Sequence, residues 1–290
     1  MSSQTATLTP IVGALVAAEE IIGKNRIWLG KSIEQTAFIT DYMFKRNELS
    51  RLSTEELRTW VSFVASELNK VLAKEGFSIK LEDFGRDEFG VVAILDVLVE
   101  WLKEGETTLI LAQNSNCYDA VRLEKSNFRT YWSPVHEHPL AVVYTKSGDK
   151  VCMTIADKAR PGFDLLARIH EINQSHLSAF PVDHIKFPMV NLDQKVNIDW
   201  LVGMSTLTHD SRRARISQAL QQTKFKMNHF GARAKSAVTV GVKIRGLQRN
   251  DDLVIDKPFY LWIMREGLSI PILTAYIDYD DWKNPGTLEM

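Results

Sequence analysis

Apolar residues near the start of the chain recur at the spacing of a helix. The positions three, four, seven and eight residues after Leu8 are all apolar, and Thr9-Pro10 is a typical helix start. The same reasoning predicts helices over 33–43 after Ser32, over 54–71 after Ser53, over 89–102 and over 163–172. The short apolar run 25–29 is typical of a strand.

The pattern changes in the second half of the chain, where short β-rich runs dominate. Residues 141–144 and 151–155 flank a glycine-containing turn and predict a hairpin. A helical patch over 198–204 interrupts a series of strands, and 259–264 with 270–279 predict a closing hairpin. Helices lead and strands follow, so we expect an α+β fold. Without repeats or low-complexity linkers we expect one domain over 1–290, mainly helical over 1–110 and mainly β over 111–290.

Composition narrows the class of protein only slightly. The chain has 290 residues, 45% of them hydrophobic, and a net charge of −1, which gives the whole molecule no bias toward nucleic acid or membranes. The start lacks the basic residues and long apolar core of a secretory signal, and no apolar run is long enough to span a membrane. We therefore expect a soluble, cytoplasmic protein and a monomer.

Two cysteines and one histidine pair are the residues that suggest thiol or metal chemistry. Cys117 and Cys152 are too few for a disulfide framework, so we expect two reduced, buried thiols, with one bridge as the alternative. His136-Glu137-His138 could chelate a metal from one face of a strand, but it lacks the helical spacing of zinc proteases. A structural or surface role is the simpler interpretation, and we expect no metal and no cofactor.

The sequence contains none of the common enzyme motifs. It has no G-x-S-x-G elbow, no phosphate-binding loop and no G-x-G-x-x-G run, so we expect the protein not to be an enzyme.

A segment with strict alternation follows Gly231. One face carries only small or apolar residues, namely Ala232, Ala234, Ser236, Val238 and Val240. The other face carries Arg233, Lys235, Ala237, Thr239 and Gly241, and no proline lies between Gly231 and Lys257. Such a segment can enter a sheet, because a strand presents alternate residues to opposite faces. An ordinary surface strand alternates in the same way.

Positive charge gathers in the same part of the chain. Ten Lys or Arg and no Asp or Glu fall between Ser211 and Asn250. A polyanion could bind a patch of five of these cations, and the alternative is a solvated basic face. The five candidates are Arg212, Arg213, Arg215, Lys224 and Lys226.

The C-terminal third resembles the serpins, a family of serine protease inhibitors. The resemblance is clearest over 184–285, where His-Ile-Lys-Phe-Pro-Met-Val at 184–190 resembles a family strand. Phe225-Lys226-Met227 resembles the strand before the reactive loop, and Gly231 stands at the family's hinge glycine. Residues 256–263 resemble the H-P-F-L-F-F-I strand, and 272–277 the last strand. Fainter similarities occur over 25–33, 95–110 and 141–157.

This resemblance implies a fold, a loop and an activity. N-terminal helices would pack on large mixed or antiparallel sheets, with an exposed reactive-centre loop over about 231–255. The protein would be a suicide inhibitor of a trypsin-like serine protease, or of a cysteine protease. Counting from the hinge glycine sets the reactive bond at Arg245-Gly246, with Lys243 and Arg249 as alternatives. Ser32 would lie under the sheet where it opens.

Several departures favour a second interpretation. The chain is several tens of residues shorter than usual, and the loss falls between 45 and 140. His229 and Phe230 replace the two acidic residues common before the hinge glycine, and Gln221 replaces a frequent histidine. The alternative is a non-inhibitory serpin-fold protein with a binding or structural role, using the basic patch.

Overall fold

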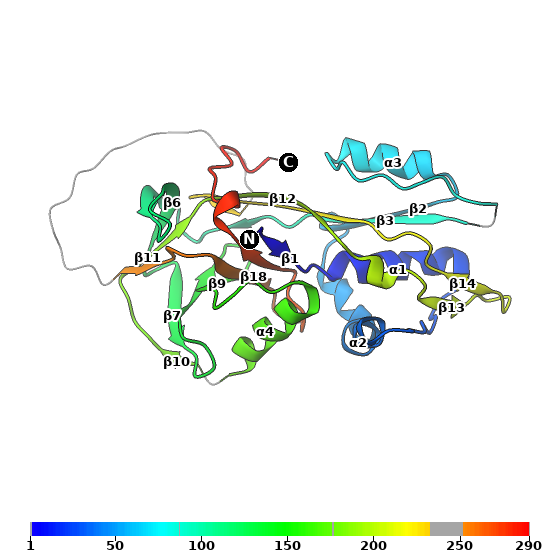
Figure 1. Ribbon diagram of the computed structural model, residues 1–290, viewed down its shortest axis with the longest axis horizontal. Coiled ribbons are helices and arrows are strands. Elements are labelled where there is room, and N and C mark those ends of the chain that lie inside the picture. The colour runs from blue at the N-terminus through cyan, green and yellow to red at the C-terminus, as the bar shows by residue number, and fades with distance from the viewer. Residues whose placement is uncertain (1, 87, 176, 233–251, 290) are drawn as a thin grey trace.

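The computed structural model describes residues 2–86, 88–175, 177–232 and 252–289 (Figure 1). Its α-helices are α1 (Thr9–Ile22), α2 (Ile33–Asp41), α3 (Ala65–Lys74) and α4 (Gly162–Gln174). Short 3-10 helices are η1 (Met43–Arg51), η2 (Asp199–Leu201) and η3 (Tyr279–Asp281). None of the described helices has the length and apolar content needed to cross a membrane.

A seven-stranded antiparallel sheet forms one layer of the core. Its order is β1-β19-β18-β9-β8-β7-β10. The strands are β1 (Gln4–Thr5), β7 (Phe128–Trp132), β8 (Leu140–Tyr144), β9 (Lys150–Ile155), β10 (Ser178–Ala179), β18 (Phe259–Met264) and β19 (Leu273–Ile277). The predicted hairpins over 141–155 and 259–279 are confirmed as β8–β9 and β18–β19. Their side chains are buried on both faces, which explains the continuous apolar runs in the sequence.

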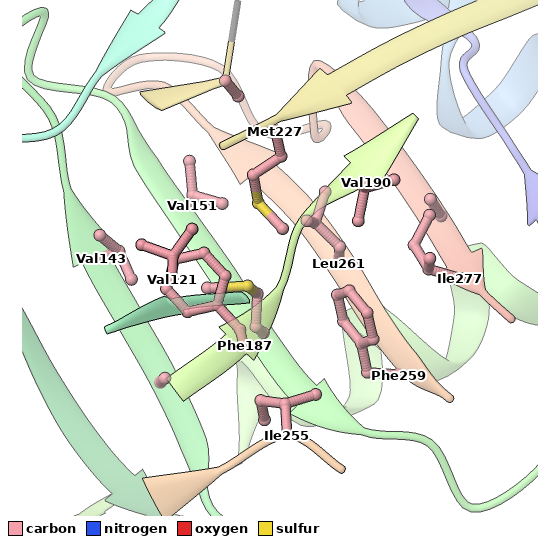
Figure 2. Close-up of a cluster of buried hydrophobic side chains, with 14 of the residues drawn as sticks. Val121, Val143, Val151, Phe187, Val190, Met227, Ile255, Phe259, Leu261 and Ile277 are labelled. Atoms are coloured by element: carbon pink, nitrogen blue, oxygen red, sulfur yellow. The ribbon is translucent and has the colours of Figure 1, made fainter. Parts of the chain in front are cut away.

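A four-stranded sheet, ordered β17-β11-β6-β5, packs against this layer. Its strands are β5 (Glu106–Leu111), β6 (Cys117–Glu124), β11 (His184–Pro188) and β17 (Asp252–Val254). Figure 2 shows the shared core, in which Val121 and Phe187 from this sheet meet Val143, Leu261 and Phe259 from the larger one. All five side chains are at most 1% exposed, so the two sheets form one apolar core.

The remaining strands form separate pairs. β2 (Leu57–Ser62) pairs with β3 (Gly90–Leu95), and β12 (Val190–Val196) pairs with β15 (Gln221–Met227). β4 (Val99–Glu100) pairs with β16 (Gly231–Ala232), and β13 (Ser205–Leu207) pairs with β14 (Arg213–Arg215). All four pairs are antiparallel, and α1 packs under β2 and β3. The α+β class is therefore confirmed.

Two predicted helices in the first third are wrong in whole or part. Residues 90–95 form strand β3 rather than a helix, because Gly-Val-Val-Ala-Ile-Leu is β-branched and its burial alternates with period two. Ser53 and Glu56 do exchange the reciprocal hydrogen bonds of a capping box, at 3.2 and 2.9 Å, but strand β2 follows them. The predicted helix over 54–71 survives only as α3 (Ala65–Lys74).

Candidate functional site

An open slot separates the β2–β3 pair from the β12–β15 pair. Within the described part of the chain, β3 has a ladder only with β2, and β15 only with β12. A cavity of about 540 Å³ lies between β3 and β15. Two strands that face each other across such a gap leave backbone donors and acceptors available for a further strand.

The walls of the slot are apolar where they face the core. All residues of β3 line the cavity; Val91, Ala93 and Leu95 are half-buried, and Val92 and Ile94 are buried in a cluster with α3. Across the gap lie residues 221–226 of β15, and the floor comes from α1, including Ile11, Ala14 and Leu15. An incoming side chain on the core face would therefore meet small and aliphatic groups.

The predicted hinge residues lie at the mouth of this slot. Gly231 and Ala232 form strand β16, opposite Glu100 and Val99 of β4. A Cβ on Gly231 would lie 2.2 Å from the Val99 carbonyl oxygen, so only glycine fits beside this backbone. Ala232 is buried, belongs to the apolar core and lines the cavity. β16 therefore lies at the end of the slot and runs antiparallel to β4.

A tight turn before β16 holds the hinge in place. The Trp101 ring nitrogen donates to the Asn228 carbonyl oxygen at 3.0 Å, and the Trp101 amide donates to that of Phe230 at 3.1 Å. The Gly105 amide donates to the His229 carbonyl oxygen at 2.8 Å. Burial lowers the pKa of His229, whose Nε2 lies 3.8 Å from a carboxylate oxygen of Glu104. Three carbonyl acceptors thus fix the turn to the segment between β4 and β5.

Residues 233–251 of the predicted loop lie outside the described residues, whereas its predicted end is a strand, β17 over Asp252–Val254, followed by the buried Ile255. The residues outside include Ala234, Ser236, Val238 and Val240 of the inserting face and the bait residues Arg245 and Gly246 with their alternatives Lys243 and Arg249.

A segment from α3 to β3 is fastened to the opposite wall of the slot. Residues 76–82, called the strap below, form hydrogen bonds with three side chains, two in β15 and one shortly before it. Gln222 Oε1 accepts from the Ser78 and Ile79 amides at 2.8 and 3.3 Å. Gln218 Oε1 accepts from the Glu82 amide at 2.9 Å, and Lys224 Nζ donates to the Gly76 carbonyl oxygen at 2.6 Å.

We expect Gln222→Ala to loosen the strap at two defined amides. Hydrogen exchange at Ser78 and Ile79 should become about five- to tenfold faster, because one hydrogen bond contributes about 1 kcal/mol. The Leu81 amide, held at 2.8 Å by Asn69 Oδ1, is the internal control and should not change. An Asn69→Ala variant should show the reverse pattern. Equal exchange at Ser78 in both variants would contradict this account of the strap.

Ser32 does not line the slot. Its Oγ accepts from the Gln35 amide at 3.2 Å and begins α2 as an N-cap. Gln35 in turn donates to the Trp200 and Val202 carbonyl oxygens. Residues of α1 occupy the floor of the slot where the resemblance had implied Ser32.

The five basic candidates fall into two groups. Arg212, Arg213 and Arg215 lie on or beside β14 and are exposed. Lys224 lies on β15, where it contacts the strap and, at 3.6 Å, Asp193. Lys226 donates to the Glu289 carbonyl oxygen. The structure therefore separates an exposed arginine group, in which Arg212 is paired with Asp210 at 2.7 Å, from two lysines that contact the strap and the C-terminal segment.

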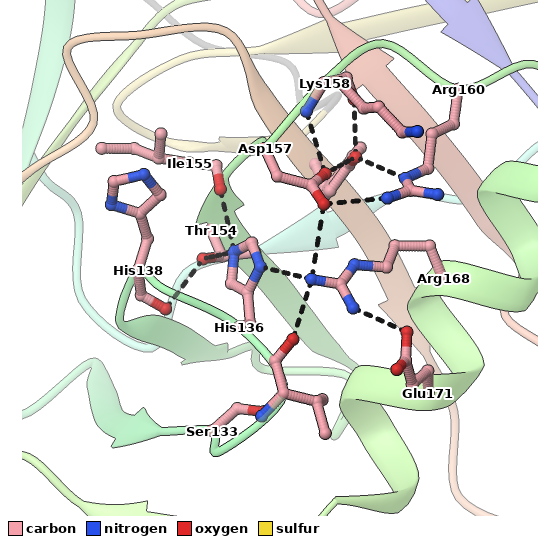
Figure 3. A network of polar contacts seen from close by, with 12 residues as sticks. Ser133, His136, His138, Thr154, Ile155, Asp157, Lys158, Arg160, Arg168 and Glu171 are labelled. Carbon is pink, nitrogen blue, oxygen red and sulfur yellow. Dashed lines mark hydrogen bonds and ion pairs between the residues drawn. The ribbon is translucent and has the colours of Figure 1, made fainter.

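The histidine pair belongs to a buried polar network rather than a metal site (Figure 3). His136 Nε2 contacts Thr154 Oγ1 and the Ile155 carbonyl oxygen at 3.0 and 2.9 Å, and Nδ1 contacts Arg168 at 3.0 Å. Burial lowers the pKa of His136. Both ring nitrogens are occupied, and the described residues contain no group of three or more potential metal ligands. The network joins α4 to β9.

The cysteines are both free, and only one matches its predicted environment. Cys152 is buried in β9, and burial raises the pKa of its thiol to about 12. Cys117 is exposed at the start of β6, so the prediction of a buried thiol is wrong there. Its position at a strand end next to a turn places its side chain outside the core.

Comparison with known proteins identifies the fold. The sequence matches no family model and no curated protein. The structure, with its open slot and hinge strand, is an α+β fold similar to that of many solved serpins.

Serpin48 of the insect Tenebrio molitor is 13% identical with a TM-score of 0.63, over 96% of this chain and 92% of that one. Mouse protein-Z dependent protease inhibitor is 10% identical with a TM-score of 0.55, over 96% and 91%. Human thyroxine-binding globulin, complexed with thyroxine, is 11% identical with a TM-score of 0.57, over 94% and 91%. The chain therefore has the serpin fold.

Proposed function

We propose that this protein is a suicide inhibitor of a trypsin-like serine protease. Its loop after Ala232 would be cut near Arg245-Gly246 and would then enter the slot between β3 and β15. The single observation that supports this most is β16, a hinge strand already paired at the mouth of an apolar slot. Two of the similar structures have different functions on the same fold: one is a protease inhibitor and the other is a thyroxine-binding globulin.

The register of β16 supports insertion of the small-residue face. Because Ala232 lies opposite Val99, an unbroken antiparallel register can be counted along β3. In an inserted strand it would set Ala234, Ser236, Val238 and Val240 opposite Val97, Leu95, Ala93 and Val91, all of which line the cavity. It sets Lys235 opposite Asp96, and Arg233 also on the outer face. The charged side chains of the loop would thus avoid the core.

The chemical step belongs to the protease. Its serine Oγ would attack the carbonyl carbon of Arg245, and the Arg245–Gly246 peptide bond would break. The protease histidine would take the serine proton and deliver it to the new Gly246 amine. Arg245 would remain as an ester on the serine. Insertion of 233–241 would carry the attached protease away from the original position of the loop. The hydrogen bonds between the strap and the β15 side would have to break to admit the new strand.

We expect Arg245→Ala to show whether the reactive bond follows Arg245 or one of the alternatives, Lys243 and Arg249. Trypsin should cut the unmodified chain first after Arg245, as the mass of the released C-terminal piece would show, because arginine fits the acidic pocket of such proteases. The variant should trap trypsin at least about 100-fold more slowly, while Lys243→Ala and Arg249→Ala, the matched controls, should change little. First cleavage after Lys243 or Arg249 would contradict the assignment.

A second candidate is a serpin-fold binding protein that does not inhibit. The observation that favours it is the hinge turn, which Trp101 and Gly105 hold with three hydrogen bonds. A hinge that stays fixed would give cleavage without insertion. Cleavage of the loop with fully active protease left in solution would support this function.

A further inference from the structure

A small three-stranded ribbon at one end of the molecule exposes an unusual face. Leu29 and Ser205 exchange both backbone hydrogen bonds, at 2.7 and 3.1 Å, and β13 pairs with β14. Segment 27–29 therefore extends the β13–β14 hairpin by one strand. In Figure 1 this hairpin lies at the end of the long axis.

The two faces of this ribbon differ sharply. Trp28 and Thr206 are buried, and Ala214 packs against the core, so these residues define the inner face. Successive side chains of a strand alternate between its faces, and on the other face Ile27, Leu29, Leu207, Arg213 and Arg215 are exposed while Ser205 is buried. We call Ile27, Leu29, Leu207, Arg213 and Arg215 the outer ribbon face.

Three aliphatic side chains on the outer ribbon face are largely exposed to solvent. Ile27 is 79% exposed, Leu29 53% and Leu207 54%. Side chains this exposed project from the surface rather than line a groove. A protein partner would need a matching hollow for each, whereas lipid acyl chains can surround them without one.

Positive charge accompanies these apolar side chains. Arg213 lies opposite Leu207, and Arg215 opposite Ser205. Neither guanidinium has a salt bridge to any carboxylate in the described part of the chain. Arg26 lies alongside and contacts the Leu207 carbonyl oxygen at 3.5 Å, and Lys24 is exposed. The one nearby acid of the hairpin, Asp210, is paired with Arg212 at 2.7 Å.

We propose that the outer ribbon face docks on an anionic phospholipid surface. The aliphatic side chains would enter the boundary between headgroups and acyl chains, and Arg213 and Arg215 would contact the lipid phosphates. The attachment is peripheral, since no described helix could span the bilayer. This inference does not depend on protease inhibition, because the three aliphatic side chains of the outer ribbon face do not line the slot, although Arg213 and Arg215 do.

The test is co-sedimentation of the full chain with vesicles. We expect binding to phosphatidylserine–phosphatidylcholine vesicles, none to pure phosphatidylcholine, and weaker binding at high salt. Ile27→Asp with Leu207→Asp should weaken binding at least about tenfold, and Arg213→Gln with Arg215→Gln several-fold.

Two matched controls distinguish binding through this face from binding through any exposed apolar or basic side chain. Leu109→Asp alters an equally exposed leucine on β5, and Lys70→Gln with Lys74→Gln removes two charges from α3. Both should bind vesicles as the unmodified chain does, and circular dichroism should show that all variants are folded. No sedimentation with anionic vesicles, or equal losses in the control variants, would overturn the proposal. Retention on heparin or polyglutamate resin without vesicle binding would also overturn it and would assign a soluble polyanion instead.

Discussion

The Ala234→Arg variant is expected to be cut by trypsin without trapping it. In a strand inserted with the register counted from β16, residue 234 would face the core beside Val97. An arginine there would have to enter an apolar cavity without a partner, and burying an unpaired charge costs far more than one strand position contributes. Insertion should stop at the hinge, and the ester to the protease should hydrolyse. Covalent complex on a denaturing gel should fall at least about 100-fold.

Lys235→Arg is the matched control for this prediction. It introduces the same side chain at the next position, but on the outer face, opposite Asp96 in the counted register. It should trap trypsin nearly as well as the unmodified chain. If Ala234→Arg still trapped protease, or if both variants failed equally, the counted register and the insertion model would be wrong.

Cleavage of the loop is expected to raise the melting temperature strongly. A strand over 234–241 would pair with both β3 and β15 and fill the cavity of about 540 Å³. On the order of ten new backbone hydrogen bonds would form, at about 1 kcal/mol each. At a few degrees per kcal/mol for a chain of this size, the midpoint should rise by roughly 20 °C or more.

Differential scanning calorimetry before and after limited trypsin digestion measures this shift. Digested Ala234→Arg is the control, since its loop is cut but cannot enter the slot, and its midpoint should not rise. An unchanged midpoint for the cut unmodified chain would mean that the slot stays empty, which would favour the non-inhibitory binding function.

Sequence patterns predict the core strands of the second half well, but they do not predict the slot between β3 and β15. The runs over 141–155 and 259–279 are apolar throughout, because both faces are buried, and they are hairpins in the structure. Gly231 was identified by resemblance and lies where a Cβ would meet the Val99 carbonyl oxygen. These features depend on local pattern or on one residue.

The failures concern features that depend on distant residues. The apolar stretch 89–102 has enough apolar residues for a helix, but its strands are specified by contacts with β2 and with Gly231 and Ala232. No local sequence pattern predicts the roles of Gln218 and Gln222, because surface glutamines are common and their hydrogen-bond partners lie 136 and 144 residues earlier in the chain. The Trp101 contact with Asn228 spans 127 residues.

The most direct test of the central claim is a denaturing gel after mixing the 33.0 kDa chain with trypsin at near-equal amounts. The account predicts a band at the summed mass that survives boiling and that is absent when the trypsin serine is chemically blocked. Only a cut chain, with free and active trypsin, would contradict the inhibitor function while leaving the serpin fold unchanged.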